Sequence, residues 1–181
     1  MFLCDKCPFG GPKVGARGNP QAAAVVVGES PGEEELRKGI PFIGPSGKVL
    51  DKVVPEGTEL LIINALQCHP PHKDLAALKK GILCCHERLL NEVQEHPRKI
   101  ILALGNPATW SLTGNYSLRI TQVRGQLIDS PLAEYGILPI VHPAYLLRGG
   151  GSFRQFRDDV RYAIDLANGN KKKNPIEPTF E

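Results

Sequence analysis

The feature that most constrains the fold is an apolar, β-branched run that ends in a short polar turn. Residues Ala22 to Val27 read AlaAlaAlaValValVal, a pattern typical of a strand buried on both faces of a sheet. The run breaks at Gly28 into the turn Glu29-Ser30-Pro31-Gly32. Open α/β sheets bind their ligands just beyond the carboxyl ends of their strands. The turn is therefore a candidate site.

The rest of the chain alternates between predicted strands and predicted helices. Three further apolar runs are predicted strands: Glu59 to Ile63, Lys99 to Leu104 and Ile137 to Val141. Apolar residues at helical spacing, with helix-start signals, predict helices at 46–54, 74–95, 107–112 and 153–166. This alternation indicates a mainly parallel sheet covered on both faces. We therefore expect an α/β fold, a three-layer α/β/α sandwich around a four-stranded mainly parallel sheet.

Length and composition fit a single domain. The 181 residues are 41% hydrophobic and 23% charged, which is typical of a globular chain with a sizeable core. We expect one domain over residues 1–168 and a polar, flexible tail over 169–181. Glycines and prolines predict a loop over residues 8–21. Short edge strands are expected at 120–123 and 126–128.

Charge and hydropathy bound the partners. The net charge of +3 permits a nucleic-acid partner without requiring one. No apolar run approaches the length of a membrane span, and the chain does not open with a signal-peptide pattern. We expect no membrane partner, a cytoplasmic location and a monomer.

Two features near the polar turn have simple structural explanations. The segment Gly44 to Lys48 ends like a phosphate-binding P-loop, but the first glycine of that motif would fall at Phe42. Val49 also replaces the Ser or Thr that holds magnesium, so the sequence argues against a nucleotide-hydrolysing P-loop. The glutamates at 33–35 suit the first turn of a short helix, where negative charge complements the helix dipole. A surface position explains all three.

Polar residues capable of chemistry follow three of the four predicted strands. They are Glu29, Asn64 and His142, and the carboxyl ends of parallel strands lie along one edge of a sheet. A carboxylate can orient water, an amide can both donate to and accept from a base, and a histidine can donate to an oxygen that becomes anionic. Phe42 can stack on a flat ring. The set suits removal of a planar leaving group, such as a nucleobase leaving a sugar.

Cysteine spacing indicates a second site. Cys4 and Cys7 form a C-x2-C pair. Cys68 stands alone, and Cys84 and Cys85 follow later in the chain as neighbours of each other. Without a signal peptide, five cysteines are better explained as metal ligands or redox groups than as a disulfide framework. Four thiolates suit structural zinc or an iron–sulfur cluster. The spacing leaves open both the metal and whether Cys84 or Cys85 is the fourth ligand.

The motifs around these residues resemble, in their order and spacing, family 4 of the uracil-DNA glycosylase superfamily, the iron–sulfur type of bacteria and archaea. Five segments carry the resemblance: GlyGluSerProGly at 28–32, ProPheIleGlyProSerGlyLys at 41–48, Asn64 with Cys68 and Pro70-Pro71, ArgGly at 124–125, and HisProAlaTyrLeuLeuArg at 142–148. The resemblance implies the fold of that superfamily. It also implies a monofunctional DNA glycosylase that flips uracil out of DNA and hydrolyses its N-glycosidic bond, which initiates base excision repair.

The resemblance further implies roles for the matching residues. Glu29 would position the attacking water, and His142 would stabilise the departing uracil anion. Phe42 would stack on the base and Asn64 would read its Watson–Crick edge, in a pocket formed by Gly28, Ser30, Phe42 and Asn64. Contacts to DNA would come from Ser46, Lys48, Tyr145, Leu146, Leu147 and Arg148. The ligands of a structural [4Fe-4S] cluster, with zinc as the alternative, would be Cys4, Cys7, Cys68 and Cys84.

Departures from the family pattern keep other functions open. Leu36 stands where the family usually has Asp, and His69 replaces a common Arg after the third cysteine. One alternative is a protein on the same scaffold that binds a base without cutting, or that excises a modified base. Another is a zinc-stapled nucleotide-binding protein. Glu29 favours the enzyme, since binding alone needs no water-positioning carboxylate, and absorbance near ~400 nm would exclude the zinc protein.

Overall fold

Strands and helices alternate along the chain in the computed structural model, which describes residue 7, residues 9–70 and residues 74–170. The strands are Arg17–Gly18 (β1), Ala24–Gly28 (β2), Leu60–Asn64 (β3), Ile100–Leu104 (β4) and Ile137–Ile140 (β5). The helices are Glu33–Lys38 (α1), Pro45–Asp51 (α2), Leu75–Gln94 (α3), Gly105–Thr113 (α4), Ile120–Val123 (α5), Pro143–Leu147 (α6) and Phe153–Ala167 (α7). The predicted ligand Cys4 and the predicted tail from residue 171 onward lie outside the described residues.

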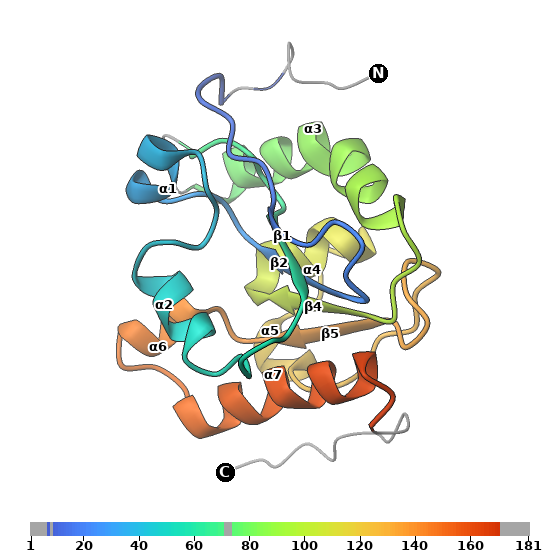
Figure 1. Ribbon diagram of the computed structural model, residues 1–181. Coiled ribbons are helices and arrows are strands. Elements are labelled where there is room, and N and C mark those ends of the chain that lie inside the picture. Colours follow the sequence, from blue (N-terminus) through green and yellow to red (C-terminus); the bar gives the residue numbers. More distant parts are fainter. Residues whose placement is uncertain (1–6, 8, 71–73, 171–181) are drawn as a thin grey trace.

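The strands form one sheet in the order β1-β3-β2-β4-β5. Strands β3, β2, β4 and β5 are parallel to their neighbours, whereas β1 is antiparallel to β3. Figure 1 shows α3 on one side of the strands and α7 on the other. The expected three-layer, mainly parallel α/β/α fold is confirmed, with one strand more than expected.

Alternating side chains of β2 enter two hydrophobic cores, one on each face of the sheet. Val25 and Val27 pack with residues of α3 and α4, whereas Ala24 and Val26 pack with residues of α2 and α7. Strands β2, β3 and β4 are buried along their whole length, as parallel strands covered on both faces should be. The apolar run at 22–27 is thus the central strand of the sheet.

The additional strand lies in the segment that was expected to be a loop. Arg17 and Gly18 of β1 pair with Ile62 and Leu61 along the free edge of β3. A strand of two residues has no periodicity in the sequence, because tertiary pairing alone determines where it forms. The prediction of a continuous loop over residues 8–21 is therefore wrong at this point.

The predicted edge strand at 120–123 is also wrong, because these residues form the single turn of α5. Its β-branched residues favour a strand, but the side chain of Asn106 accepts a hydrogen bond from the Ile120 amide at 2.6 Å. That bond fixes the start of a helical turn. The strand predicted at 126–128 is reduced to one antiparallel bridge between Ile128 and Ile137.

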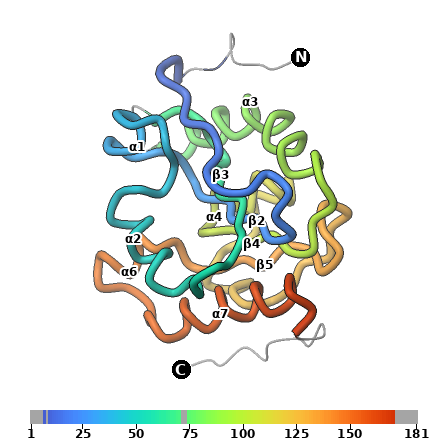
Figure 2. The backbone as a smooth tube through the Cα atoms, in the orientation of Figure 1, coloured from blue at the N-terminus to red at the C-terminus, as the bar shows by residue number. Residues whose placement is uncertain are grey.

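The segment before β1 is held against α3. Phe9 is buried, and Gly81 of α3 leaves room for its ring, which a Cβ at that position would overlap. The Val14 amide donates a hydrogen bond to the Gln67 carbonyl at 2.9 Å. Figure 2 shows this segment passing from the neighbourhood of α3 to the edge of the sheet beside β3. Among the described helices, none combines the length and the apolar character that a membrane crossing requires.

Candidate active site

A cavity of about 450 Å³ opens at the carboxyl ends of the parallel strands. Its walls come from the turn after β2, the segment leading into α2, the end of β3, and helix α6 with the residues flanking it. The sequence-predicted site residues among its lining are Glu29, Ser30, Phe42, Ser46, Asn64, His142 and Arg148. The structure therefore gathers at one place side chains that lie more than one hundred residues apart in the chain.

The turn after β2 places Glu29 at the cavity. The pairing between β2 and β3 continues past the strands, because the Ala65 amide donates to the Gly28 carbonyl and the Leu66 amide donates to the Glu29 carbonyl, each at 2.9 Å. The backbone of Glu29 is thus tied to the neighbouring strand. The partly buried side chain of Glu29 therefore extends from a backbone whose position is fixed by hydrogen bonds.

Gly28 allows the side chains of Asn64 and Phe42 to lie against the same point of the backbone. A Cβ at this position would overlap both Oδ1 of Asn64 and the ring of Phe42. Any larger residue would therefore displace the amide or the aromatic ring. Gly28 itself does not belong to the cavity lining, and its part in the site is to leave space for these two side chains.

Asn64 presents a buried acceptor at the end of β3. Its side chain is 3% exposed, and its Oδ1 has no hydrogen-bond partner among the described residues. Leaving a buried acceptor unpaired costs about 1–3 kcal/mol, so this atom indicates the place of a donor from outside the chain. The backbone of Asn64 is held in turn by Arg88 of α3, whose Nη2 donates to the Asn64 carbonyl at 2.9 Å.

Phe42 is held in an unusual backbone conformation. It is the non-glycine residue with a positive φ, 56°, among the described residues, a strain of about 1–3 kcal/mol that the surroundings must stabilise. Arg17 of β1 donates from Nη1 to the Phe42 carbonyl at 2.8 Å and forms an ion pair with Asp51 at 2.6 Å. Gly47 of α2 packs so closely on that carbonyl that a Cβ would overlap it.

His142 is a neutral donor at the opposite wall. It is the N-cap of α6, and the Ala144 amide donates to its Nδ1 at 3.1 Å, so the proton of the neutral ring is on Nε2. Burial, and then the positive charge of Arg148, lower the pKa of His142 to about 4. Its ring lies 6.1 Å from the Phe42 ring, centroid to centroid. At neutral pH an uncharged N–H donor therefore faces the same space as the aromatic ring.

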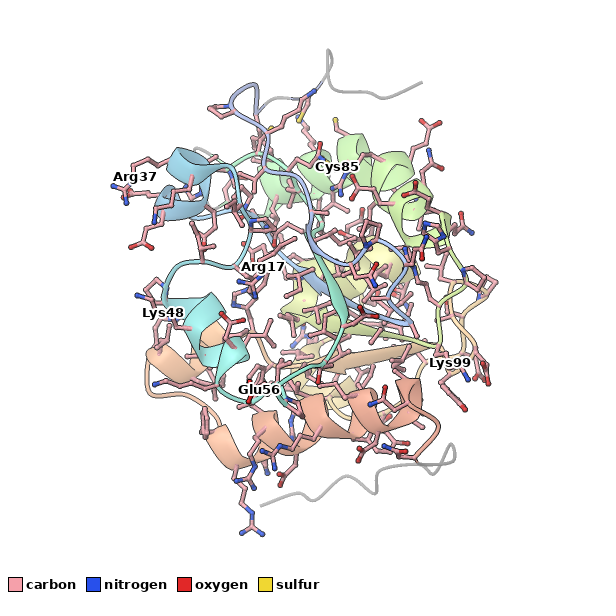
Figure 3. The ribbon with its side chains drawn as sticks, viewed as in Figure 1. Arg17, Arg37, Lys48, Glu56, Cys85 and Lys99 are labelled. Carbon is pink, nitrogen blue, oxygen red and sulfur yellow. The ribbon has the colours of Figure 1, made fainter. Side chains whose placement is uncertain are left out.

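The other predicted DNA contacts lie around the cavity. Tyr145 and Leu147 of α6 are 47% and 52% exposed, whereas Leu146 packs against the core beneath. Lys48 projects outward from α2 (Figure 3) and does not belong to the cavity lining. An exposed apolar and basic surface thus borders the open cavity that Glu29, Asn64 and His142 line.

Glu35 is a functional candidate that the sequence reasoning placed on the surface, and that placement is wrong. The side chain is 8% exposed. Its carboxylate accepts hydrogen bonds from the amides of Gly32 at 3.1 Å, Ile43 at 3.1 Å and Gly44 at 2.8 Å. The capping-box spacing from Gly32 to Glu35 is the signal that could have identified it.

His69, noted in the sequence as a replacement, also lines the cavity. Its Nδ1 lies 2.7 Å from the Pro31 carbonyl, and because a carbonyl only accepts, Nδ1 is the donor. The residue therefore links the Cys68 loop to the turn that carries Glu29.

The predicted metal ligands are not assembled within the described residues. Cys7 and Cys68 line a small cavity of about 40 Å³ together with Cys85, which is labelled on α3 in Figure 3. Cys84 is half-buried and does not belong to that lining. In the described part of the chain no three cysteine, histidine or acidic residues form a metal-binding group. The thiol donors nevertheless suit the chemistry of zinc or an iron–sulfur cluster.

Comparison with known proteins identifies the class to which this site belongs. The family model of the uracil DNA glycosylase superfamily matches residues 16–164. A type-4 uracil-DNA glycosylase of Thermotoga maritima is 34% identical over 177 residues, covering 94% of this chain and 90% of that protein. Type-4 uracil-DNA glycosylases of Sulfurisphaera tokodaii (31% identity; 96% and 90% covered) and Saccharolobus solfataricus (30%; 87% and 79%) are similar as well. The chain belongs to the uracil DNA glycosylase superfamily, and the resemblance seen in its motifs is confirmed.

Proposed function

We propose that the chain is a uracil-DNA glycosylase, which hydrolyses the bond between uracil and deoxyribose in DNA and so initiates base excision repair. The observation that carries the proposal is the convergence of Glu29, Asn64 and His142 beside Phe42 in one cavity. The names of the similar proteins support the same reaction.

Recognition of uracil is assigned to Phe42 and Asn64. The ring of Phe42 stacks on the flipped base. The amide of Asn64 accepts from the N3–H of uracil through its unpaired Oδ1 and donates to O4 through Nδ2. Cytosine presents no N3–H and carries an amino group in place of O4, so the same amide orientation does not match it.

Bond cleavage is assigned to His142 and Glu29. As the bond between N1 of uracil and C1′ of the sugar breaks, the electron pair leaves with the base and negative charge develops on O2. The Nε2–H of neutral His142 donates to that oxygen. Glu29 orients the water whose oxygen forms the new bond to C1′, and the water proton that is released is available to the departing base.

The partner is uracil-containing DNA, bound at the surface around the cavity. Ser46 lines the cavity at the start of α2 and Arg148 follows α6, so both are placed for phosphate contacts, as is exposed Lys48. The half-exposed Tyr145 and Leu147 are placed to enter the space that the flipped nucleotide leaves. We also propose that the protein acts as a monomer and in the cytoplasm, where its thiols stay reduced.

A [4Fe-4S] cluster held by Cys4, Cys7, Cys68 and Cys84 is the proposed cofactor, with zinc as the alternative. Such a group would act structurally, by joining the N-terminal segment to the Cys68 loop and α3. Absorbance near ~400 nm together with iron and sulfide content separates the cluster from zinc, which is spectroscopically silent. Because Cys85 lines the small cavity, Cys84→Ser and Cys85→Ser should be compared. The variant that loses the metal identifies the fourth ligand.

The function is tested with a labelled oligonucleotide that contains one deoxyuridine. Incubation with the purified protein followed by alkali should cleave the strand at that position, and Asn64→Ala should lower the rate of uracil release about 100-fold by removing hydrogen bonds to the base. A folded, metal-loaded protein that leaves the strand intact would contradict the assignment. Retention of the uncut DNA would then indicate a binder, and cleavage at a modified pyrimidine a different base specificity.

A further inference from the structure

We propose that Glu35 is a positioning residue of the reaction, which holds the Glu29 turn and the Phe42 loop in one fixed arrangement. The inference rests on the proposed function, since it concerns the geometry of that site. Glu35 is the third residue of α1, and its buried carboxylate lies between two loops that are separated in sequence by that helix.

The carboxylate bonds to both loops at once. Oε2 accepts from the amide of Gly32, the last residue of the turn that begins at Glu29, at 3.1 Å. Oε1 accepts from the amides of Ile43 and Gly44 at 3.1 and 2.8 Å, immediately after Phe42. One side chain therefore joins the segment that carries the water-positioning carboxylate to the segment that carries the stacking ring.

The two glycines in contact with Glu35 are explained by the carboxylate and not by their backbone. Gly32 has φ −87° and ψ −176°, and Gly44 has φ −78° and ψ −167°, conformations open to any residue. The nearest atom to an added Cβ is Oε2 of Glu35 for Gly32, at 2.7 Å, and Oε1 of Glu35 for Gly44, at 3.0 Å. Both loops are thus shaped to admit this carboxylate.

The bonding pattern requires a carboxylate in particular. Three backbone N–H groups converge on two oxygens, and a carboxylate is acceptor-only, whereas an amide side chain replaces one acceptor with a donor. Gly32 and Gly44 are also the N-caps of α1 and α2, where negative charge is favourable. Losing the carboxylate would free the two loops to move relative to each other, and displacements of about 1 Å can lower a reaction rate about 100-fold.

The first variants are Glu35→Gln and Gly44→Ala, studied by single-turnover release of uracil from DNA and by inhibition with free uracil. Glu35→Gln should lower the rate of uracil release about 10- to 100-fold. It should also weaken inhibition by uracil, because the Phe42 ring and the Glu29 carboxylate no longer face the base together. Gly44→Ala should lower the rate of release and the affinity for free uracil several-fold each, since its methyl group displaces the Glu35 carboxylate without straining the backbone.

A double-mutant cycle shows whether Gly44→Ala acts through Glu35. In a Glu35→Ala background the three atoms nearest to the added methyl group, all of them in the Glu35 carboxylate, are gone, so Gly44→Ala should have little further effect. Val93→Ala is the stability control, because Val93 is fully buried on α3 in the core away from the cavity. All variants are compared well below their melting temperatures.

The outcomes separate the inference from the proposed function. If the wild-type chain releases uracil and both Glu35→Gln and Gly44→Ala match it in rate and in inhibition by uracil, Glu35 is not a positioning residue and the proposed function stands. The inference also fails if Val93→Ala, at equal loss of stability, weakens both readouts as much. If Glu35→Ala does not fold, the results for Glu35→Gln and Gly44→Ala decide whether Glu35 is a positioning residue. A wild-type chain that releases no uracil overturns both proposals.

Discussion

The floor and the rim of the cavity are built in different ways. The floor consists of Glu29, Phe42 and Asn64. A buried or half-buried side chain bonds to the backbone of each of these three segments. Glu35 bonds near Glu29, Arg17 bonds to Phe42, and Arg88 bonds to Asn64. The rim consists of α6, a helix of five residues with two half-exposed apolar side chains, and the three glycines at 149–151 that follow it.

The difference separates two tasks. Breaking the bond to uracil needs reacting groups fixed to within a fraction of an ångström, and the floor has the anchors for this. Contact with DNA needs an accessible surface, and the rim has that surface. We therefore expect floor variants to slow excision equally from single- and double-stranded DNA. Rim variants should act mainly on double strands, where the base must first be flipped out.

The largest effect is expected from Glu29→Gln in the floor. The amide keeps the size of the side chain but orients water poorly, so single-turnover excision should fall about 10²- to 10⁴-fold on both kinds of DNA. Melting temperature should change little, and uracil release from both substrates measures the effect. A rate near that of the wild type, in a folded protein, would remove Glu29 from the mechanism.

Arg17→Met should have the next largest effect, through Phe42. It removes the donor to the strained Phe42 carbonyl, and excision should fall about tenfold on both substrates because the stacking ring shifts. Asp51→Asn is the matched control, since it removes the exposed ion pair and leaves the bond from Arg17 to Phe42 in place. Equal losses in the two variants would show that the ion pair, and not the bond to the backbone, is what matters.

Leu147→Ala probes the rim. The side chain is half-exposed, so stability should change by less than about 0.5 kcal/mol. Excision from double-stranded DNA should fall several-fold while excision from single strands is retained. Leu83→Ala, at an exposed leucine of α3, controls for loss of apolar surface. If both substrates are affected equally, the proposed division between floor and rim is wrong.

Arg148→Gln should have the smallest effect and tests how the charge that follows α6 influences His142 at the start of that helix. Because burial and Arg148 lower the pKa of His142 to about 4, wild-type excision should be insensitive to this group from neutral pH down to about pH 5. Removing the positive charge should raise the pKa towards 6.5, with burial still holding it below that value. The acid limb of the rate, and the ring titration of His142 by NMR, should move upward.

The same titration affects stability. A depressed histidine pKa contributes stability that is fully present above pH 6.5 and is lost as the pH falls through about 4. The wild type should therefore lose this part of its free energy of unfolding between those two values, and Arg148→Gln should lose less. Arg154→Gln, at a highly exposed arginine of α7, should leave the pKa of His142 unchanged.

The sequence predicts the polar residues at the strand ends of the site because strand ends in a parallel sheet share one edge. Glu29, Asn64 and His142 each follow an apolar run, and that pattern is sufficient to bring them to one cavity. The layers of the fold follow from the same alternation of apolar runs and amphipathic helices. In these respects, local pattern and tertiary structure agree.

The anchors could not be predicted in the same way. Glu35 has the spacing of a capping box, but its bonds to Ile43 and Gly44 depend on a loop that returns from elsewhere. Arg17 lies in a two-residue strand without a pattern, and its acceptor is a backbone carbonyl. At Ile120 to Val123 the local pattern is present but misleading. Its β-branched residues favour a strand, whereas the hydrogen bond from the Ile120 amide to the Asn106 side chain favours a helical turn. Bonds from side chains to distant backbone leave no periodic signal.

The short strand β1 also bears on how the protein avoids aggregation. It pairs with Leu61 and Ile62 in the middle of the edge of β3. The sequence of β3, LeuLeuIleIleAsn, is apolar and rich in residues that favour cross-β association. An uncovered edge of that kind can pair with another chain, and here Arg17 places a charge along it. Shortening the chain past β1 would therefore be expected to promote intermolecular pairing. Arg17, which bonds to the Phe42 carbonyl, would then also help to keep neighbouring copies apart.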